Sequence, residues 1–324
     1  MHLRFRIGFT AAGLAAMLWW GGPAAAQSCS FSNTGVNFGN VNLTTSGFSN
    51  ATGIFTAQCT GTPRQTIRIC PNFNEGSGGI QAGGGDRLLR QGATTMRYDL
   101  FKTNGVGQVW GSYTWPYASR PPVLSITLDA AGFGTVSQTI FGRISNQQTT
   151  ALPGTFSSVF AGTQTRIDYG YSASFNCSAT LSPRVQSVPF IVTTTNNSSC
   201  TVTASELNFG NHTSLASAKL TTNTITANCT AGTQFEIGLN NGSSGATNPA
   251  QRRMKSPVNT STIAYGIFRN AARTQEWGST SGSNTVSALG TGTAQVFTGY
   301  GAVPAQTTPP AQNYADSIVV VVTY

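Results

Sequence analysis

Six cysteines are the residues of this 324-residue chain whose type and spacing most directly imply chemistry. Two of the intervals between them nearly repeat, at 30 and 29 residues. The Cys-x-x-Cys spacing of zinc sites and thiol redox enzymes is absent, whereas an even count in an exported chain indicates disulfides. Each repeated bridge would close a loop of about 30 residues and stabilise the fold by about 3 to 4 kcal/mol. The repeat predicts three disulfides: Cys29–Cys59, Cys200–Cys229 and, by elimination, Cys70–Cys177.

Residues for other kinds of chemistry are scarce. After the N-terminal segment described next, His212 is the single histidine, and no carboxylate pair or nucleophile–base spacing stands out. Glycine-rich stretches such as 74–79 and 83–85 do not lead into a helix through Lys-Ser or Lys-Thr, as a phosphate-binding loop would. We therefore expect no catalytic activity, metal site or cofactor.

The first 26 residues have the pattern of a secretory signal peptide. Arg4 and Arg6 supply the positive end, residues 7–20 are apolar, and 24–26 are alanines suited to cleavage. The alternative is a membrane anchor, but the apolar stretch is shorter than the ~20 residues that a span needs. We predict cleavage after Ala26 and export of a chain that begins at Gln27.

Charged residues are few and mostly basic. The leader contains two of the 18 Lys and Arg, so 16 remain against nine Asp and Glu. The positive residues are scattered, with one cluster at 252–255, which we interpret as a solvated loop in preference to a docking patch. We expect no nucleic-acid partner.

Short alternating apolar runs, bounded by Gly, Asn, Ser and Pro, recur along the chain, and no long stretch keeps a helical period. Residues 65–69, 96–100, 123–128 and 235–239 are examples. The pattern predicts an all-β chain with an antiparallel β-sandwich in each half. Because the cysteine spacing repeats too, we expect two tandem domains.

The repeat also carries a series of motifs. In the second copy Leu207-Asn-Phe-Gly is followed by Arg253-Met, Tyr265, Trp277-Gly, Tyr300-Gly and Tyr314-Ala-Asp, and similar residues follow in the same order in the first copy. This series resembles the spore coat protein U domain family, which includes the subunits of archaic, Csu-type chaperone–usher pili. The resemblance is strong over 200–324 and looser over 29–170, where insertions at 109–122 and 130–138 depart from it. It implies two tandem immunoglobulin-like sandwiches, of which the C-terminal one lacks its final strand and receives one from a chaperone, then from a neighbouring subunit.

The resemblance also implies a division of labour along the chain. Residues 27–184 would be an adhesive domain and residues 200–324 a pilin domain that couples to the fibre. Between them, 185–199 is either a linker or a donor-like strand. Val188, Phe190 and Val192 would share one face of that strand, which favours a final strand of the first domain, and Pro189 would restrict it to an edge of the sheet.

The end of the sequence is a strand that is apolar on both faces and must be covered. It is either a central strand of its own domain or the wall of a groove that accepts a strand from another chain, and the resemblance favours the groove. We expect the groove to involve Ile318, Val320, Val322 and Tyr324. Only Gln27 and Ser28 would precede the first cysteine, too few to donate a strand, so we expect the subunit to end a polymer.

Insertions in the first copy are apolar for loops, and apolar loop tips on an exported domain usually mark a contact surface. The alternative is that these side chains fold back onto the sandwich. The resemblance suggests that they grip nonpolar surfaces, and Trp115 with Tyr117 would also suit stacking on a sugar. The candidate adhesive residues are Ile80, Trp115, Tyr117, Val123, Phe133 and Val136.

The sequence therefore supports one main functional hypothesis. The chain would be a non-enzymatic tip adhesin of a chaperone–usher pilus, exported through the periplasm and displayed on the cell surface for attachment and biofilm formation. Its partners would be a periplasmic chaperone, an outer-membrane usher, an adjacent pilin that donates a strand, and an apolar or glycan target surface. The alternative is a secreted carbohydrate-binding or coat protein that is not assembled into pili.

Overall fold

A computed structural model describes residues 26–324 except 45–46, 84, 105–106, 146–147 and 179–184. The predicted leader, 1–26, lies outside the described residues apart from Ala26. Strands make up nearly all the regular structure, with two short 3-10 turns, η1 (Gly162–Gln164) and η2 (Pro249–Gln251). No helix in the described part of the chain is long and apolar enough to span a membrane.

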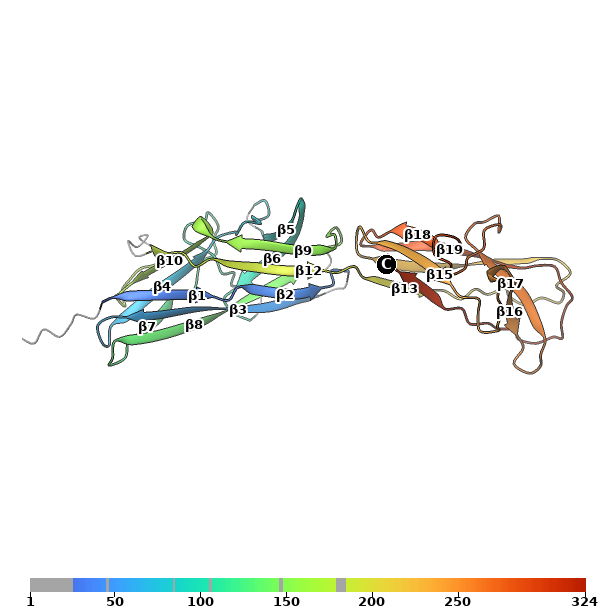
Figure 1. The fold of residues 1–324 in the computed structure, drawn as a ribbon, viewed down its shortest axis with the longest axis horizontal. Coiled ribbons are helices and arrows are strands. Elements are labelled where there is room, and N and C mark those ends of the chain that lie inside the picture. Colours follow the sequence, from blue (N-terminus) through green and yellow to red (C-terminus); the bar gives the residue numbers. More distant parts are fainter. Residues whose placement is uncertain (1–25, 45–46, 84, 105–106, 146–147, 179–184) are drawn as a thin grey trace, which may run out of the picture.

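The strands form two β-sandwiches that lie end to end in an elongated molecule (Figure 1). The first sandwich pairs an eight-stranded sheet, in the order β1-β3-β8-β6-β5-β9-β12-β2, with a four-stranded sheet in the order β11-β10-β4-β7. The strands of the larger sheet are β1 (Ser28–Asn33), β2 (Val36–Val41), β3 (Phe48–Thr60), β5 (Arg87–Gln91), β6 (Thr94–Phe101), β8 (Phe133–Ser145), β9 (Gly154–Phe160) and β12 (Phe190–Asn196). Those of the smaller sheet are β4 (Thr66–Phe73), β7 (Leu124–Thr127), β10 (Thr165–Gly170) and β11 (Val185–Gln186).

The second sandwich repeats this plan with fewer strands. A five-stranded sheet, in the order β13-β14-β19-β17-β16, faces a three-stranded sheet in the order β18-β15-β20. The strands are β13 (Cys200–Ala204), β14 (Lys219–Cys229), β15 (Gln234–Leu239), β16 (Arg252–Lys255), β17 (Thr262–Phe268), β18 (Val286–Leu289), β19 (Ala294–Val303) and β20 (Val320–Thr323). The predicted all-β fold with a sandwich in each half is confirmed.

Each sandwich has its own hydrophobic core, and the alternation in the sequence explains how it forms. Every second residue of a strand points to the same face, so alternating apolar residues bury one face of each sheet. The first core is centred on large side chains such as Phe55, Phe73 and Trp110, and the second on Phe235 and Trp277. The two cores are separate clusters, which agrees with a repeat of two units.

The three disulfides form as the cysteine repeat predicts. Cys29–Cys59 joins β1 to β3, and Cys200–Cys229 joins β13 to β14 in the same way. In both cases the bridge links directly opposed residues of an antiparallel pair. The third bridge, from Cys70 to Cys177, ties β4 to the segment that follows β10.

A buried arginine occupies the same place in each sandwich. Arg87 donates to the carbonyls of Phe73, Asn74 and Trp110 and forms an ion pair with Asp99. A buried guanidinium can hold several carbonyls at once because its five N–H donors are fixed in one plane.

In the second sandwich Arg252 donates to the carbonyls of Leu239, Asn240 and Trp277, at 3.2, 2.8 and 2.7 Å, and to that of Pro249 at 2.7 Å. The neighbouring tryptophans behave alike too, since Trp110 donates to Pro71 and Trp277 to Ile237. These contacts fix the residue-by-residue equivalence of the two sandwiches.

The position of Arg252 corrects one expectation from the sequence. Residues 252–255 are not a solvated loop but strand β16, and Arg252 is fully buried. Its neighbour Arg253 is exposed, because successive side chains of a strand point to opposite faces. A run of basic residues at a strand therefore does not imply that all of them face solvent.

The segment between the two cysteine repeats forms β12, which pairs with β9 on one side and β2 on the other. Val188, Phe190 and Val192 are buried in the first core, as the alternation indicates. The expected edge position is wrong, because β12 lies inside the sheet. Pro189 is compatible with this placement because it precedes Phe190, the first paired residue of β12. Proline has no backbone N–H, and at this position no hydrogen bond of the ladder requires one.

Replacing the buried arginine should destabilise the second sandwich while its exposed neighbour tolerates the same change. Arg252→Lys cannot reach all four carbonyls, so we expect the free energy of unfolding to fall by about 2–4 kcal/mol. Arg253→Lys, the matched control, should change it by less than about 0.5 kcal/mol. Urea unfolding followed by tryptophan fluorescence would check this, and equal stability of the two variants would contradict the role given to Arg252.

Candidate functional site: an open groove in the second sandwich

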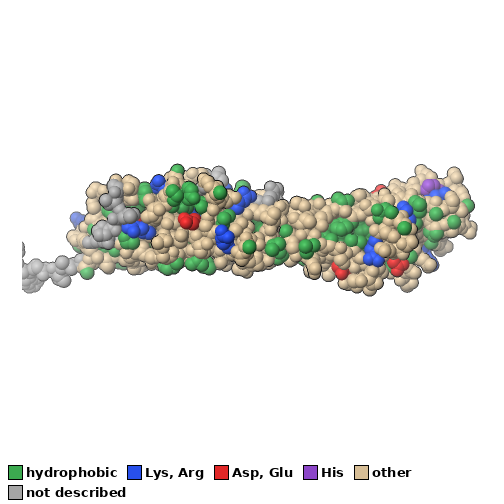
Figure 2. Space-filling model, turned by 90° about the horizontal axis from the view of Figure 1, so that it is seen from above, with side chains coloured by type: hydrophobic (Ala, Val, Ile, Leu, Met, Phe, Trp, Pro, Cys, Tyr) green, Lys and Arg blue, Asp and Glu red, His purple; other side chains and the backbone are tan. Residues whose placement is uncertain are grey.

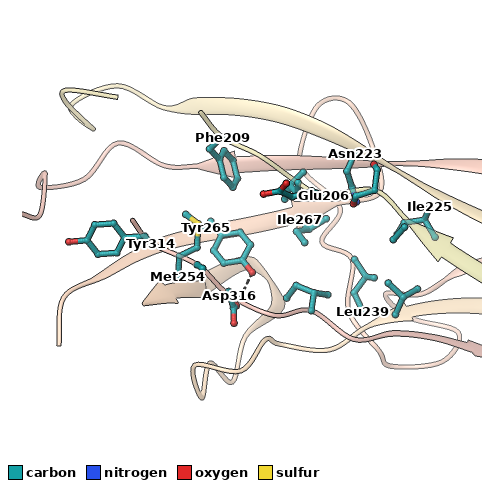
Figure 3. A pocket seen from close by; sticks show the side chains of 16 residues that line it. Glu206, Phe209, Asn223, Ile225, Leu239, Met254, Tyr265, Ile267, Tyr314 and Asp316 are labelled. Atoms are coloured by element: carbon teal, nitrogen blue, oxygen red, sulfur yellow. Dashed lines mark hydrogen bonds between the residues drawn. The ribbon is translucent and has the colours of Figure 1, made fainter. Parts of the chain in front are cut away.

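A groove with a volume of about 350 Å³ opens on the side of the second sandwich (Figure 3). One wall comes from 204–209, which follow β13, and the other from 314–320, which lead into β20. The floor is apolar and comes from both sheets. The apolar residues that line it include Leu207, Phe209, Ile225, Ile267, Ile318 and Val320.

The first sandwich shows what occupies the same place there. Gly142 packs against Val36 and Phe38, and in the second sandwich Gly301 packs in the same way against Leu207 and Phe209. Residues 207–211 therefore correspond to β2.

The other wall has a counterpart as well. Arg90 on β5 bridges Ser157 on β9, and Lys255 on β16 bridges Ala315, so 314–318 correspond to part of β9. The strand between β2 and β9 in the first sandwich is β12. In the second sandwich that position is the groove.

The walls of the groove differ from their counterparts in regular structure. In the first sandwich β2 and β9 are strands because both pair with β12. In the second, 205–212 form no strand, and between 311 and 319 only Ala315 takes part in a β-bridge. The backbone N–H and C=O groups that would face an added strand are thus left without ladder partners in the described chain.

Of the four residues expected in the groove, the structure places two on its lining and two outside it. Ile318 and Val320 line it. Val322 packs against the same core from β20 but does not line the groove. Tyr324 is 59% exposed and lies beside Phe235 and Leu289, away from the groove, so its assignment to the wall is corrected.

A tyrosine and a carboxylate form the main polar contact of the groove (Figure 3). The Tyr265 hydroxyl donates to Asp316 Oδ2 at 2.8 Å. Burial raises the pKa of Tyr265 above its usual value, and the neighbouring carboxylate raises it further. The hydroxyl therefore stays protonated and remains a donor. Ser243 donates its backbone N–H to Asp316 Oδ1 at 2.8 Å, which ties this wall to the loop after β15.

The sequence did not single out the aromatic residues of the groove as a site. Phe209 and Tyr265 lie edge to face, with ring centroids 6.0 Å apart, and Met254 lines the same space. All three belong to the repeated motifs, where aromatic residues are more often core. Tyr265 is buried in the second core, and Phe209 and Met254 are partly buried against it, so the groove reaches into this core.

The candidate adhesive residues are not all exposed. Trp115 is only 6% exposed, and its indole N–H donates to the Ser119 carbonyl. Its ring stacks with the Arg87 guanidinium, 4.6 Å from the centroid, so it is held in the fold. Trp115 is therefore removed from the adhesive set, and its ring is not available to stack on a sugar.

The other candidates differ in exposure. Phe133 and Val123 are 45% and 41% exposed, whereas Ile80, Tyr117 and Val136 are half-buried. Phe133 opens β8 opposite Thr60, at the far end of the ladder from the second sandwich (Figure 1). The space-filling view shows hydrophobic side chains in small separate groups over both sandwiches (Figure 2).

The lone histidine of the described chain has a structural contact. A ring nitrogen of His212 lies 2.6 Å from the Phe209 carbonyl, in the turn that follows the groove wall. The described residues contain no group of three or more potential metal ligands.

Comparisons with known proteins agree with this architecture. A solved chaperone–tip adhesion subunit pre-assembly complex, CsuC–CsuE of archaic chaperone–usher Csu pili of Acinetobacter baumannii, aligns over 92% of this chain and all of the other, with 14% identity and a TM-score of 0.52. The CupB6 tip adhesin of Pseudomonas aeruginosa aligns over 93% of this chain and 95% of its own, with 11% identity and a TM-score of 0.38. No curated protein matches the chain.

The family comparison is more decisive. The model of the Spore Coat Protein U domain matches twice, over residues 17–163 and 186–321. The two matches broadly follow the two sandwiches, but β10 lies outside both matches and β12 falls in the second match although it pairs in the first sandwich. Because the matches cover most of the sequence, the chain belongs to the Spore Coat Protein U domain family.

Proposed function

We propose that this chain is a non-enzymatic tip adhesin of a chaperone–usher pilus, in which residues 27–184 attach to a surface and 200–324 couple to the fibre. The main support for the proposal is the groove between 204–209 and 314–320. In the first sandwich β12 fills the equivalent position, and the second sandwich has no counterpart of this strand among the described residues. A strand supplied by another chain would pair with both walls and cover the apolar floor.

The groove would be filled twice in succession. A periplasmic chaperone would first supply a strand, because an apolar groove with unpaired backbone edges invites aggregation. At an outer-membrane usher, an adjacent pilin would then replace that strand with its own. The fold resembles a tip subunit that was solved together with a chaperone, which supports this order of partners.

The first sandwich would carry the attachment function. Its own β12 completes it, so it needs no strand from a partner and is free to face outward. Phe133 and Val123 are its exposed candidates for contact with an apolar surface. Attachment through such side chains would be broad in target and would support biofilm formation, because apolar burial is non-directional.

Export of the chain to the periplasm should give soluble protein only when the partner chaperone is co-expressed. The exposed groove would otherwise draw the chain into aggregates. Soluble yield after osmotic shock, with and without the chaperone, measures the effect. A chain that is soluble and monomeric without the chaperone would contradict the proposal of an acceptor groove.

Two substitutions on one strand separate the groove from the general stability of β20. Val320→Asp places a charge on the groove lining and should abolish co-purification with the chaperone. Val321→Asp changes the next residue, which is exposed on the other face, and should leave the complex intact. Loss of the complex in both variants would argue against a specific groove.

The adhesive role of the far end is tested with two exposed phenylalanines of one ladder. Phe133→Ser should reduce attachment to polystyrene several-fold, because it removes apolar area from the expected contact surface. Phe48→Ser is the control, since Phe48 is exposed at the opposite end of the β3–β8 ladder. Cell counts on the plastic measure the effect, and unchanged attachment of Phe133→Ser would remove this loop from the site.

A further inference from the structure

The groove of the second sandwich has a charge opposite to that of the chain as a whole. Glu206 and Asp316 both line it, and no Lys or Arg does. They are two of only nine acidic residues, in a chain with 18 basic ones. A concave surface lined by one sign of charge favours an occupant of the opposite sign.

Neither carboxylate has a counterpart in the first sandwich. The place of Glu206 is held there by Gly35, one residue before β2, and the place of Asp316 by Ser158 on β9. Both counterparts lie against β12. The groove of the second sandwich thus differs in charge from the position that β12 fills in the first, where the filling strand touches the walls.

The two carboxylates are satisfied to different degrees. Asp316 accepts from Tyr265 and Ser243, and Arg252 lies deeper in the same sandwich. Glu206 takes part in no ion pair or hydrogen bond with the other described residues and is exposed in the open groove. Covering it with an apolar strand would desolvate a charge without giving it a partner, which is unfavourable.

The first sandwich locates the strand residue that would lie beside Glu206. Val192 of β12 pairs with Val36, so Ile191 lies opposite Gly35. Gly35 has a positive φ of 72°, and a Cβ built on it would collide with the Ile191 carbonyl oxygen, at 2.5 Å. Glu206 has no positive φ, so its side chain leaves the backbone in another direction, and it lines the groove. Ile191 is 45% exposed, so its side chain points outward, to the side where a charged group can be accommodated.

We propose that the strand that fills the groove carries a lysine or arginine at the place that Ile191 takes in β12, where its charge pairs with Glu206. The inference rests on the proposed function, because it requires that a strand enters the groove. The occupant is an extended segment of another subunit with alternating apolar residues on its inner face and this basic residue on its outer face. The basic residue would distinguish it from β12 itself.

Synthetic peptides based on the filling strand of the first sandwich test the charge preference. Each spans Gln186–Asn196, one with Ile191→Lys and the other with Ile191→Gln, a polar side chain without charge. They are added in excess to the full chain purified with its chaperone, and native mass spectrometry follows the fraction of chain that has taken up peptide. We expect the lysine peptide to enter with roughly five-fold preference, the size of a cross-strand charge pair. The preference should shrink at high salt.

Protein variants assign the preference to one carboxylate. Glu206→Gln should make the two peptides equivalent, whereas Glu75→Gln, a carboxylate of the first sandwich, should leave the preference unchanged. Equal uptake of both peptides by the unmodified chain overturns the charge pairing but leaves the groove as a strand acceptor. Uptake of neither peptide overturns the groove itself, and the inference with it. A preference that survives Glu206→Gln also overturns the pairing.

Discussion

The structure depends on one constraint: backbone N–H and C=O groups at the edge of a strand need partners. In the first sandwich the chain meets this need itself, because β12 lies between β2 and β9 and pairs with both. In the second sandwich the matching walls have no strand between them, and they do not become strands at all. Secondary structure in these segments is therefore a consequence of the added strand, and an incomplete sandwich follows from the absence of a single element.

Two buried arginines show how one scaffold serves both a complete and an open sandwich. Arg87 and Arg252 hold equivalent carbonyls, so the framework behind the groove does not require the filling strand. The surroundings differ, because Arg87 is neutralised by Asp99 within the core. Arg252 forms no ion pair within the described chain, and the carboxylates that act on it are Asp316 on the groove wall and Glu276. In the open sandwich, acidic charge has thus moved from the core to the surface that a partner would cover.

The sequence was sufficient where the signal was local or repeated. Cysteine spacing predicted the three disulfides, and the alternation of apolar residues predicted the strands and the burial of Val188, Phe190 and Val192. Predictions from the sequence were wrong where the burial of a side chain depends on contacts with residues distant in the sequence. Arg252 looked like part of a solvated cluster because three of its four carbonyl partners, Leu239, Asn240 and Trp277, come from other segments.

The prediction that Trp115 is an exposed adhesive residue was wrong for a similar reason. It looked like an exposed loop tip because its contact with Arg87 joins residues 28 positions apart. The groove was only partly predictable, since the sequence indicated β20 but not the second wall at 204–209.

The short connection between the sandwiches also has a mechanical consequence. Only residues 197–199 separate the end of β12 from the start of β13, so a pull on the second sandwich acts directly on β12. That strand is bonded along both sides, through seven paired residues with β9 and a parallel ladder with β2. Because the load runs along the strand axis, these bonds are sheared together instead of being opened one after another. In the proposed adhesive role, a cell that drags on its attachment point would thus load β12 in shear.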